Sequence, residues 1–294
     1  MGCQLCPRMC GAERESGEVG ICGGGRNLRV ARAALHMWEE PPISGTRGSG
    51  TIFFSGCPLG CLFCQNSKIS RENFGTEISE DRLGEIMLSL KAAGAHNINL
   101  VTPTHYSDII ARVLERVKPT LGIPVVYNSS GYERVESLRE LEGLVDIYLP
   151  DLKYSSTELS QKYSRAPDYY EYAAPALLEM HRQVGRAEFD GEGLMTRGII
   201  VRHLVLPSCR KDSIELMHRL AELLPVGDIK LSLMSQYTPE YAGESGWPEL
   251  LRRVTTFEYN SVLDVALSLG FDGYYQERTS ALPSYTPSFD LTGI

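Results

Sequence analysis

The sequence lacks the features that would take this protein to a membrane or to a nucleic acid. No run of about 20 apolar residues is present to span a bilayer, and the N-terminus begins with cysteines where a signal peptide would carry a basic and then an apolar stretch. A basic excess is also missing, since the formal net charge is −8, whereas nucleic acids and anionic lipids call for basic faces. We expect a cytoplasmic protein with small-molecule or protein partners, no membrane association and no nucleic-acid partner.

The composition is that of an ordinary globular protein, except for the placement of its cysteines. The 294 residues, 43% hydrophobic and 22% charged, suffice for one large core or a core with a small appended domain. Every one of the 8 cysteines except Cys209 lies at or before Cys64. In a reducing compartment, cysteines clustered in this way are more typical of ligands to a metal or an iron–sulfur cluster than of disulfides.

The most informative stretch is the segment 55–66, in which Cys57, Cys61 and Cys64 have the spacing C-x3-C-x2-C directly after an apolar run. A [4Fe–4S] cluster that only transfers electrons is held by four thiolates. Because no fourth cysteine is adjacent, one iron would stay open to bind a substrate or cofactor. The spacing is also compatible with a zinc site whose fourth ligand is water, or with buried apolar cysteines, but it favours the cluster.

A second set of cysteines lies nearer the N-terminus, in residues 1–48, which show no clear periodicity. Cys3, Cys6, Cys10 and Cys22 provide four thiolates for one closed site, which suits zinc or a second [4Fe–4S] cluster. So short a segment buries little apolar surface, and a bound metal would supply the missing stability. A cap without metal is the remaining alternative.

From residue 51 onward, short apolar strands alternate with amphipathic helices, which predicts a parallel sheet with helices outside it. The predicted strands are 51–54, 97–101, 125–128, 145–149, 199–206 and 230–234. The first predicted helix begins near Ser79, its N-cap, and the other predicted helices span 107–118, 133–141, 169–183, 213–224 and 248–269. Six units are too few for a closed eight-stranded barrel. The sequence therefore predicts an α/β fold: a partial (β/α)6 TIM-type barrel at 49–238, a Cys-rich metal-binding cap at 1–48, and a C-terminal helical extension and tail at 239–294.

Polar residues end each predicted strand, where parallel barrels carry their functional groups. These residues are Thr102 and Thr104 with His105, Asn128 and Ser129, and Asp151 and Lys153, while Arg202 and His203 lie inside the fifth predicted strand. Asp151 and Lys153 would lie on one side of an extended chain and suit a zwitterionic amino acid, or form a surface ion pair. Of Arg202 and His203, one faces the interior and the other the helices. We expect His105 in the mouth of the barrel and Cys209 as a small buried group.

Five motifs together give the chain a specific resemblance. It is similar over most of its length to the radical S-adenosylmethionine (SAM) proteins related to the activating enzyme of pyruvate formate-lyase, most closely to the PflX-like branch. The motifs are the N-terminal C-x-L-C-P-R-x-C-G at 3–11, H-x-W-E-E-P at 36–41, C-Q-N at 64–66, N-I-N-L-V-T-P-T-H at 97–105, and Y-L-P-D-L-K-Y at 148–154. The resemblance implies a partial TIM-type barrel, a SAM-chelated [4Fe–4S] cluster and reductive cleavage of SAM.

The resemblance also implies roles for single residues. Cys57, Cys61 and Cys64 would hold the cluster, Phe63 would pack near the adenine, and Asp151 and Lys153 would hold the SAM carboxylate. Two strand ends depart from the pattern. Residues 128–131 read Asn-Ser-Ser-Gly where activating enzymes have Asp-Thr-Asn-Gly, and residues 102–104 read Thr-Pro-Thr where many radical SAM enzymes have Gly-Gly-Glu. Backbone carbonyls and threonine hydroxyls would then receive the SAM ammonium.

The function that these expectations imply is that of a radical SAM oxidoreductase. SAM would be cleaved to a 5′-deoxyadenosyl radical that abstracts hydrogen from a substrate, in the narrower version a backbone glycine of a partner enzyme. One alternative is a radical SAM enzyme that acts on a small molecule or another macromolecule. The other is a non-catalytic iron–sulfur protein that transfers electrons or binds a partner. An electron donor such as flavodoxin or ferredoxin is the expected redox partner.

Overall fold

A large, mostly parallel sheet forms the centre of the computed structural model, which describes residues 2–243, 246–276 and 286–294. Its strands follow the order β10-β9-β8-β6-β5-β4-β2-β1-β3. The parallel strands are β2 (Ser49–Phe54), β4 (Ile98–Val101), β5 (Val125–Ser129), β6 (Ile147–Pro150), β8 (Met195–Leu204), β9 (Lys230–Met234) and β10 (Gly273–Tyr275). Each predicted strand overlaps one of these, and the predicted α/β fold is confirmed.

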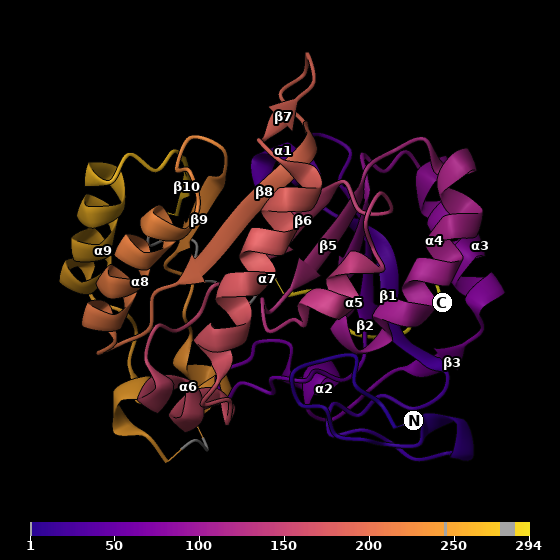
Figure 1. Cartoon of the computed structure of the whole chain (residues 1–294), viewed down its shortest axis with the longest axis horizontal. Helices are drawn as coiled ribbons and strands as arrows, with labels where there is room; N and C mark the ends of the chain where they lie inside the picture. The colour runs from indigo at the N-terminus through magenta and orange to yellow at the C-terminus, as the bar shows by residue number, and fades with distance from the viewer. Residues whose placement is uncertain (1, 244–245, 277–285) are drawn as a thin grey trace.

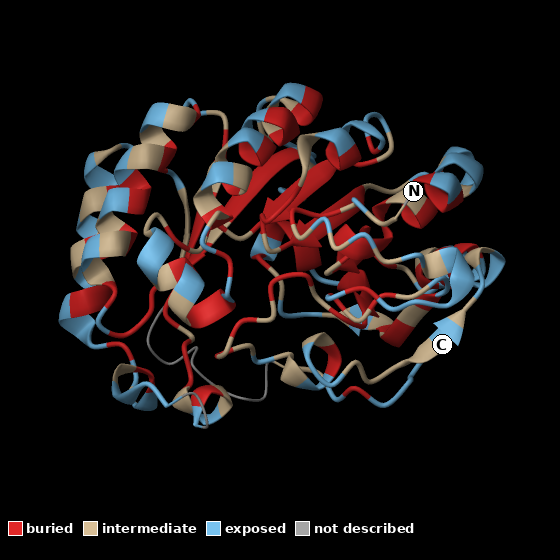
Figure 2. Cartoon of the chain, turned by 60° about the horizontal axis from the view of Figure 1, so that its bottom comes forward, coloured by how far each residue is buried: buried red, intermediate tan, exposed pale blue. Residues whose placement is uncertain are grey.

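Helices cover the outside of the sheet, in the positions that the 3.6-residue period predicts. The longer ones are α3 (Glu80–Ala92), α4 (Ser107–Leu121), α7 (Tyr169–Val184), α8 (Arg210–Leu223) and α9 (Thr256–Ser268). The shorter ones are α1 (Pro41–Ser44), α2 (Ser67–Ser70), α5 (Val135–Arg139), α6 (Thr157–Ser164), and the 3-10 turns η1 (Arg14–Ser16), η2 (Thr104–Tyr106), η3 (Pro239–Ala242) and η4 (Pro248–Leu251). Figure 2 shows buried strands and helices exposed on their outer faces, as expected for a parallel sheet.

Local sequence signals explain where some helices begin. The hydroxyl of Ser79 accepts a hydrogen bond from the Arg82 amide at 3.1 Å, so the predicted N-cap of α3 is confirmed. The predicted helix over 248–269 is wrong in its first half. The chain there makes η4 and then begins α9 at Thr256, after a capping box between Thr255 and Glu258.

Four of the described strands lie outside the predicted barrel. Strand β1 (Leu28–His36), in the segment predicted to be irregular, pairs antiparallel with β2, and β3 (Thr76–Ile78) pairs with β1. At the other edge β10 adds a seventh parallel strand beside β9. The hairpin strand β7 (Glu188–Phe189) pairs with β8. The division at residues 48 and 238 stays a prediction, although strands from all three parts share one sheet.

The two ends of the parallel strands differ. Because β1 is antiparallel to β2, with His36 opposite Ser49, the segment that follows β1 lies at the N-terminal ends of the strands. There Ile43 of α1 packs against apolar side chains from β5, β6 and β8 (Val126, Ile147, Leu149 and Ile200). In Figure 1 the N-terminal segment and α2 lie instead at the end toward which the β8 arrow points. The N-terminal segment and α2 therefore lie at the carboxyl end of the strands.

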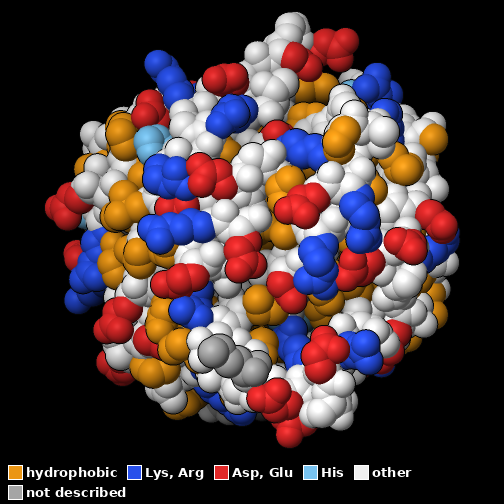
Figure 3. All heavy atoms as spheres, turned by 45° about the vertical axis from the view of Figure 1, so that its right-hand side comes forward, with side chains coloured by type: hydrophobic (Ala, Val, Ile, Leu, Met, Phe, Trp, Pro, Cys, Tyr) orange, Lys and Arg blue, Asp and Glu red, His pale blue; other side chains and the backbone are white. Residues whose placement is uncertain are grey.

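The surface carries charge of both signs. Figure 3, which brings the right-hand side of Figure 1 forward, shows acidic and basic side chains interspersed over this face. None of the described helices combines the length and the apolar character needed to cross a bilayer.

Candidate active site

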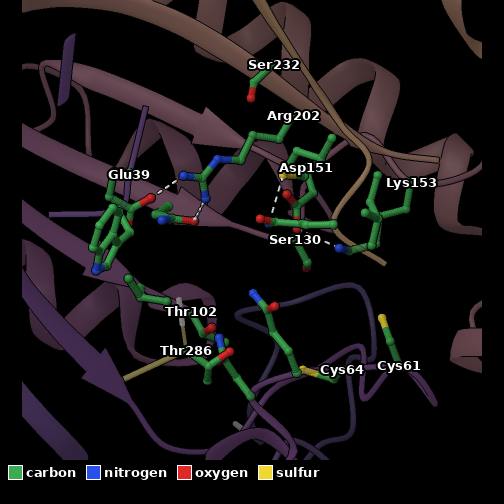
Figure 4. Close-up of a pocket in the computed structure, with 18 of the residues that line it drawn as sticks. Glu39, Cys61, Cys64, Thr102, Ser130, Asp151, Lys153, Arg202, Ser232 and Thr286 are labelled. Atoms are coloured by element: carbon green, nitrogen blue, oxygen red, sulfur yellow. Dashed lines mark hydrogen bonds and ion pairs between the residues drawn. The ribbon is translucent and has the colours of Figure 1, made fainter. Parts of the chain in front are cut away.

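A cavity of about 710 Å³ opens at the carboxyl ends of the parallel strands. Side chains from the cysteine segment and from most of the strand ends line it. In Figure 4, Cys61 and Cys64 lie at one side of this space and Glu39, Arg202 and Ser232 at the other. The predicted site residues among its lining are Cys57, Cys61, Phe63, Cys64, Thr102, Asn128, Ser129, Asp151, Lys153 and Arg202.

The three cysteines lie on the segment 55–66, which we call the triplet loop and which follows β2. Each sulfur accepts one hydrogen bond: from the Leu59 amide to Cys57 (3.4 Å), from the Ser164 hydroxyl to Cys61 (3.1 Å), and from the Ser70 hydroxyl to Cys64 (3.3 Å). Burial raises the pKa of Cys57 to about 12, so the free thiol holds its proton. A bound metal would displace that proton, since metals bind the thiolate.

Lys153 and Asp151 form a partly buried ion pair beside the triplet loop, with Nζ to Oδ2 at 2.6 Å. Burial alone would lower the pKa of Lys153, but the Asp151 carboxylate and the Cys61 thiolate together hold this pKa above its ordinary value. The Tyr169 hydroxyl fixes the local backbone, because it accepts from the Lys153 amide (3.0 Å) and donates to the carbonyls of Asp151 (2.9 Å) and Ser130 (2.8 Å). A fixed carboxylate and ammonium are therefore available to a charged ligand.

The inner side of the cavity is a cluster of charges that the sequence did not predict. Arg202 donates twice to Glu40, from Nε and Nη2 at 2.7 Å each, and also bonds Glu39. Glu39 accepts from Asn99 of β4 at 2.9 Å. Burial would raise the pKa of Glu40, but Arg202 holds it below its ordinary value. We call Glu39, Glu40 and Arg202 the acidic floor, since two carboxylates share one guanidinium.

The floor residues reach the cavity from the segment between β1 and α1, far from the triplet loop in sequence. In the sequence, Glu39 and Glu40 appear only as a Glu-Glu run before Pro41 and Pro42, and no role in the site was predicted for them. Ser130 was also missed: its side-chain oxygen is buried in the cavity wall without a hydrogen-bond partner. An unpaired buried hydroxyl is costly, which fits a wall built to receive a polar ligand.

Two predicted mouth residues lie elsewhere. Thr104 does not line the cavity, because its buried hydroxyl donates to Glu133 at 2.6 Å. Burial raises the pKa of Glu133 to about 7. The expectation that His105 lies in the mouth is wrong, since His105 is fully buried with Nε2 2.8 Å from the Ser55 carbonyl. Thr104 and His105 form η2, and this turn carries both side chains away from the strand end.

Other predicted residues lie where the strand pattern places them. Arg202 faces the cavity, and His203 is buried on the opposite side between the Leu152 carbonyl (2.7 Å) and Ser213 of α8 (2.9 Å). Cys209 is a buried group outside the cavity. The ring of Phe63 lines the cavity and packs edge-on against Tyr237, with centroids 6.1 Å apart. Thr102 ends β4 in a left-handed conformation, with φ at 60°.

The N-terminal cysteines lie near one another without closing into a site: Cys10 and Cys22 flank one residue, and Cys3 and Cys22 are near enough to Cys6 to affect its pKa. A side-chain carbon at Gly20 would lie 3.3 Å from Cys10 Sγ and 3.4 Å from Cys22 Sγ, so these two sulfurs flank one residue. Cys22 Sγ accepts from the Gly24 amide and from Arg14 Nη2, both at 3.3 Å. Burial, with smaller contributions from the neighbouring Cys22 and Cys3 thiolates, raises the pKa of Cys6 to about 12.

Neither cysteine set is closed around a common point. Within the described ranges, no three His, Cys, Asp or Glu side chains are grouped as a ready metal site, and this applies to the triplet loop as well. The fit to a metal therefore rests on the donors, which are three sulfurs on one loop and four in the N-terminal segment. The three triplet sulfurs and Cys22 Sγ accept hydrogen bonds of the kind that metal-bound thiolates accept. Both sets suit iron or zinc.

A parallel α/β sheet whose first parallel strand leads into a C-x3-C-x2-C loop, with a polar cavity at the strand ends, defines the core of a radical SAM enzyme. Residues 51–186 match the model of the family described as the radical SAM superfamily. Members of that family use a [4Fe–4S] cluster and SAM to catalyse radical reactions.

Comparisons beyond the family match agree with this assignment. The chain is 28% identical over 286 residues to an uncharacterized protein of Methanocaldococcus jannaschii, covering 93% of this chain and 76% of the relative. In structure it resembles a radical SAM methyltransferase from Sphaerobacter thermophilus (TM-score 0.52, 16% identity, 78% of this chain and 66% of the other). It also resembles Streptococcus suis SuiB bound to its precursor peptide SuiA (TM-score 0.52, 12% identity, 78% and 48%). The chain thus spans less than two thirds of both structures, which share its fold.

Proposed function

We propose that this chain holds a [4Fe–4S] cluster on Cys57, Cys61 and Cys64, binds SAM in the cavity, and abstracts hydrogen from a substrate that enters the same cavity. The single observation that carries the proposal is the triplet loop opening onto a polar cavity within a radical SAM segment. When bound, the cluster supplies the electron that cleaves SAM to methionine and a 5′-deoxyadenosyl radical. The chain's own residues bind and orient the reactants.

The polar wall of the cavity would hold SAM. Lys153 is placed to pair with the methionine carboxylate, because its ammonium faces the triplet loop and is anchored by Asp151. Ser130 offers an unpaired buried hydroxyl. Thr102 and Asn128 line the same wall, and the threonine hydroxyl and asparagine carbonyl can accept from the methionine ammonium. Phe63 offers a ring face to the adenine.

Anaerobic reconstitution tests the activity. The protein is loaded with iron and sulfide, reduced with dithionite and given SAM, and 5′-deoxyadenosine is measured by chromatography. We expect the nucleoside from the wild-type chain and from Cys209→Ala, whose thiol lies outside the cavity, and none from Cys61→Ala. If SAM survives while a cluster is present in the wild-type chain, the proposal fails and a non-catalytic iron–sulfur protein is the better description.

The substrate has two candidate classes. The resemblance to activating enzymes supports a backbone glycine of a partner enzyme. The acidic floor supports a small polar molecule instead, because a backbone segment offers only neutral amides to a buried group of two carboxylates and one guanidinium. A deuterium-transfer experiment separates them. Extract from cells grown in heavy water is divided by ultrafiltration, and each fraction is given to the reconstituted protein.

Deuterium in 5′-deoxyadenosine identifies the fraction that contains the hydrogen donor. Transfer from the retained macromolecules supports the protein substrate, and transfer from the filtrate supports the small molecule. Transfer from neither fraction, with SAM still cleaved, refutes abstraction from a cellular substrate and leaves only uncoupled cleavage.

We also propose that Cys3, Cys6, Cys10 and Cys22 hold a second metal, either zinc or a second [4Fe–4S] cluster. Metal analysis of the Cys57→Ala/Cys61→Ala/Cys64→Ala protein distinguishes them. About four residual irons indicate a cluster, about one zinc indicates a structural site, and no metal refutes the proposal. An electron donor of the flavodoxin or ferredoxin class, in a reducing cytoplasm, would complete the system.

A further inference from the structure

The N-terminal cysteine segment, residues 3–25, is bonded directly to the triplet loop. The Cys57 amide donates to the Cys22 carbonyl at 2.8 Å, which joins a member of one cysteine set to a member of the other through a single backbone hydrogen bond. Gly56 keeps this contact close: its φ is 87°, and a side-chain carbon there would lie 2.3 Å from the Cys22 carbonyl oxygen. No larger residue fits between the two segments without moving one of them.

Arg8 makes a second connection from between Cys6 and Cys10. Its Nε donates to the Pro58 carbonyl at 2.8 Å, and its other nitrogens donate to the carbonyls of Ser164 (3.0 Å) and Arg165 (2.5 Å). Pro58 directly follows the first cysteine of the triplet, and the Ser164 hydroxyl donates to Cys61. One guanidinium therefore fixes both the loop and the group that hydrogen-bonds its middle sulfur.

Arg14 makes a third connection at the start of the loop. Its Nη2 donates to Cys22 Sγ at 3.3 Å and its Nη1 donates to the His105 carbonyl at 2.6 Å. The His105 ring in turn contacts the Ser55 carbonyl at 2.8 Å. The Nε atom of Arg14 is buried without a hydrogen-bond acceptor. A buried, unpaired donor beside Cys22 Sγ points to an anionic group still to be placed there, such as a metal-bound thiolate or sulfide.

The segment 3–25 has little besides its cysteines to hold it in place. Its side chains that are buried are mainly those of Cys6, Pro7 and Cys22. Ordering the backbone costs about 1 to 2 kcal/mol per residue, which so few apolar contacts cannot offset. A metal bound by thiolates would offset it, as in other small metal-stabilised segments.

We propose that the thiolate metal site of Cys3, Cys6, Cys10 and Cys22 acts as the structural lock of the triplet loop. Metal binding orders the Cys22 carbonyl, Arg8 and Arg14, and these hold Cys57, Cys61 and Cys64 ready for their cluster. Zinc and iron would both serve, because the effect needs a crosslink and no redox change. This inference rests on the proposed function, in that the triplet is taken to hold the SAM-binding cluster.

Hydrogen–deuterium exchange of the full-length protein tests the lock. Cys10→Ser removes one ligand of the N-terminal site, while Arg8→Met keeps all the cysteines and removes only the link. Arg26→Met is the matched control, because Arg26 lies next to the same segment but is 65% exposed and pairs with the exposed Glu15. Exchange at 55–66 is measured after each protein has been treated with metal in the same way, and the metal content of each protein is determined in parallel.

We expect Cys10→Ser to lose the N-terminal metal and to exchange the triplet-loop amides at least tenfold faster. Arg8→Met should keep that metal and still exchange the loop about tenfold faster, since hydrogen bonds to a charged group shift an opening equilibrium by about this factor. Chelator should remove the triplet cluster faster from both variants, followed by its absorbance. Arg26→Met should behave as wild type. Exchange in β5 and β6 reports whether each variant is folded.

If folded Arg8→Met exchanges its triplet-loop amides and retains its cluster as the wild-type protein does, the proposed lock is overturned, whatever Cys10→Ser shows. A wild-type chain that cleaves SAM and keeps its cluster after its N-terminal metal is removed would overturn it as well. Failure of the proposed function looks different, because then no iron depends on Cys57, Cys61 and Cys64 even when the N-terminal site is full.

Discussion

Replacing Arg202 by methionine should destabilise the protein strongly, because the acidic floor then holds two buried carboxylates without a counter-charge. Methionine keeps an unbranched apolar chain and removes the guanidinium. Glu40 loses both of its 2.7 Å bonds, and Glu39 and Asn128 lose one partner each. Breaking one member of a buried ion pair costs about 3 to 5 kcal/mol. We expect the free energy of unfolding at pH 8 to fall by about this amount.

The loss should depend on pH in a direction that the structure fixes. In the wild-type protein Arg202 holds the pKa of Glu40 below its ordinary value against the effect of burial. The pair therefore contributes stability that is present above the ordinary pKa and is lost as the pH falls through the lowered one. In Arg202→Met burial acts unopposed and raises the pKa of Glu40. Protonation then relieves the buried charge, so the difference between the two proteins should shrink as the pH falls from 8 to 5.

Urea unfolding under anaerobic conditions, followed by circular dichroism at several pH values, measures this difference. Arg219→Met is the control, because Arg219 forms an exposed pair with Glu215 on α8, a kind of pair that contributes at most about 1 kcal/mol. A loss below about 1 kcal/mol for Arg202→Met at pH 8, or a loss that does not change with pH, would refute the description of the floor as a buried charge cluster.

Three further predictions concern the site and its support. Gly56→Ala should abolish cluster retention, because the added carbon meets the Cys22 carbonyl at 2.3 Å. Gly60→Ala, also at positive φ but with nothing within 4 Å, should cost only about 1 kcal/mol of backbone strain. Absorbance after reconstitution and urea unfolding compare the two variants, and equal effects would contradict the packing argument. Lys153→Met should weaken SAM binding at least about tenfold by removing a charge-assisted contact, measured by equilibrium dialysis with the reconstituted protein, and unchanged affinity would exclude Lys153 from the SAM site. Burial lowers the pKa of His105 to about 4. The free energy of unfolding should therefore fall as the pH falls from about 6.5 toward 4, by up to about 1.4 kcal/mol per pH unit. Urea unfolding of His105→Gln should lack this contribution to the slope of the unfolding free energy against pH, and an unchanged slope would show that His105 is not its source.

Much of the fold could be predicted because its signals are local. The strands β2, β4, β5, β6, β8 and β9 each coincide with an apolar run, and the N-cap of α3 is a single serine. The edge strands escaped prediction because their partners are distant. β1 lies among glycines and cysteines without a clear period and pairs antiparallel with β2, and β10 has three residues, of which Gly273 pairs with the distant Leu231 of β9.

The cavity lining was predicted in part, because the order of the strands can be inferred from the sequence. Asp151, Lys153 and Arg202 were found because a parallel sheet brings all carboxyl strand ends to one side. Thr104 and His105 were placed wrongly in the mouth, because the turn η2 after β4 directs both side chains into the core. Strand position alone does not indicate where the residues beyond a strand end will turn.

The sequence by itself predicted the three cysteines of the triplet loop as ligands and the class of chemistry proposed for them, because these residues lie within eight positions of one another and need no distant segment to define their spacing. Only the tertiary structure decided what surrounds them. The acidic floor joins Glu40 to Arg202 across 162 positions, and Arg8 reaches Ser164 across 156. Contacts of this range depend on how the sheet, α1 and the N-terminal segment pack together, and no local pattern of residues encodes them.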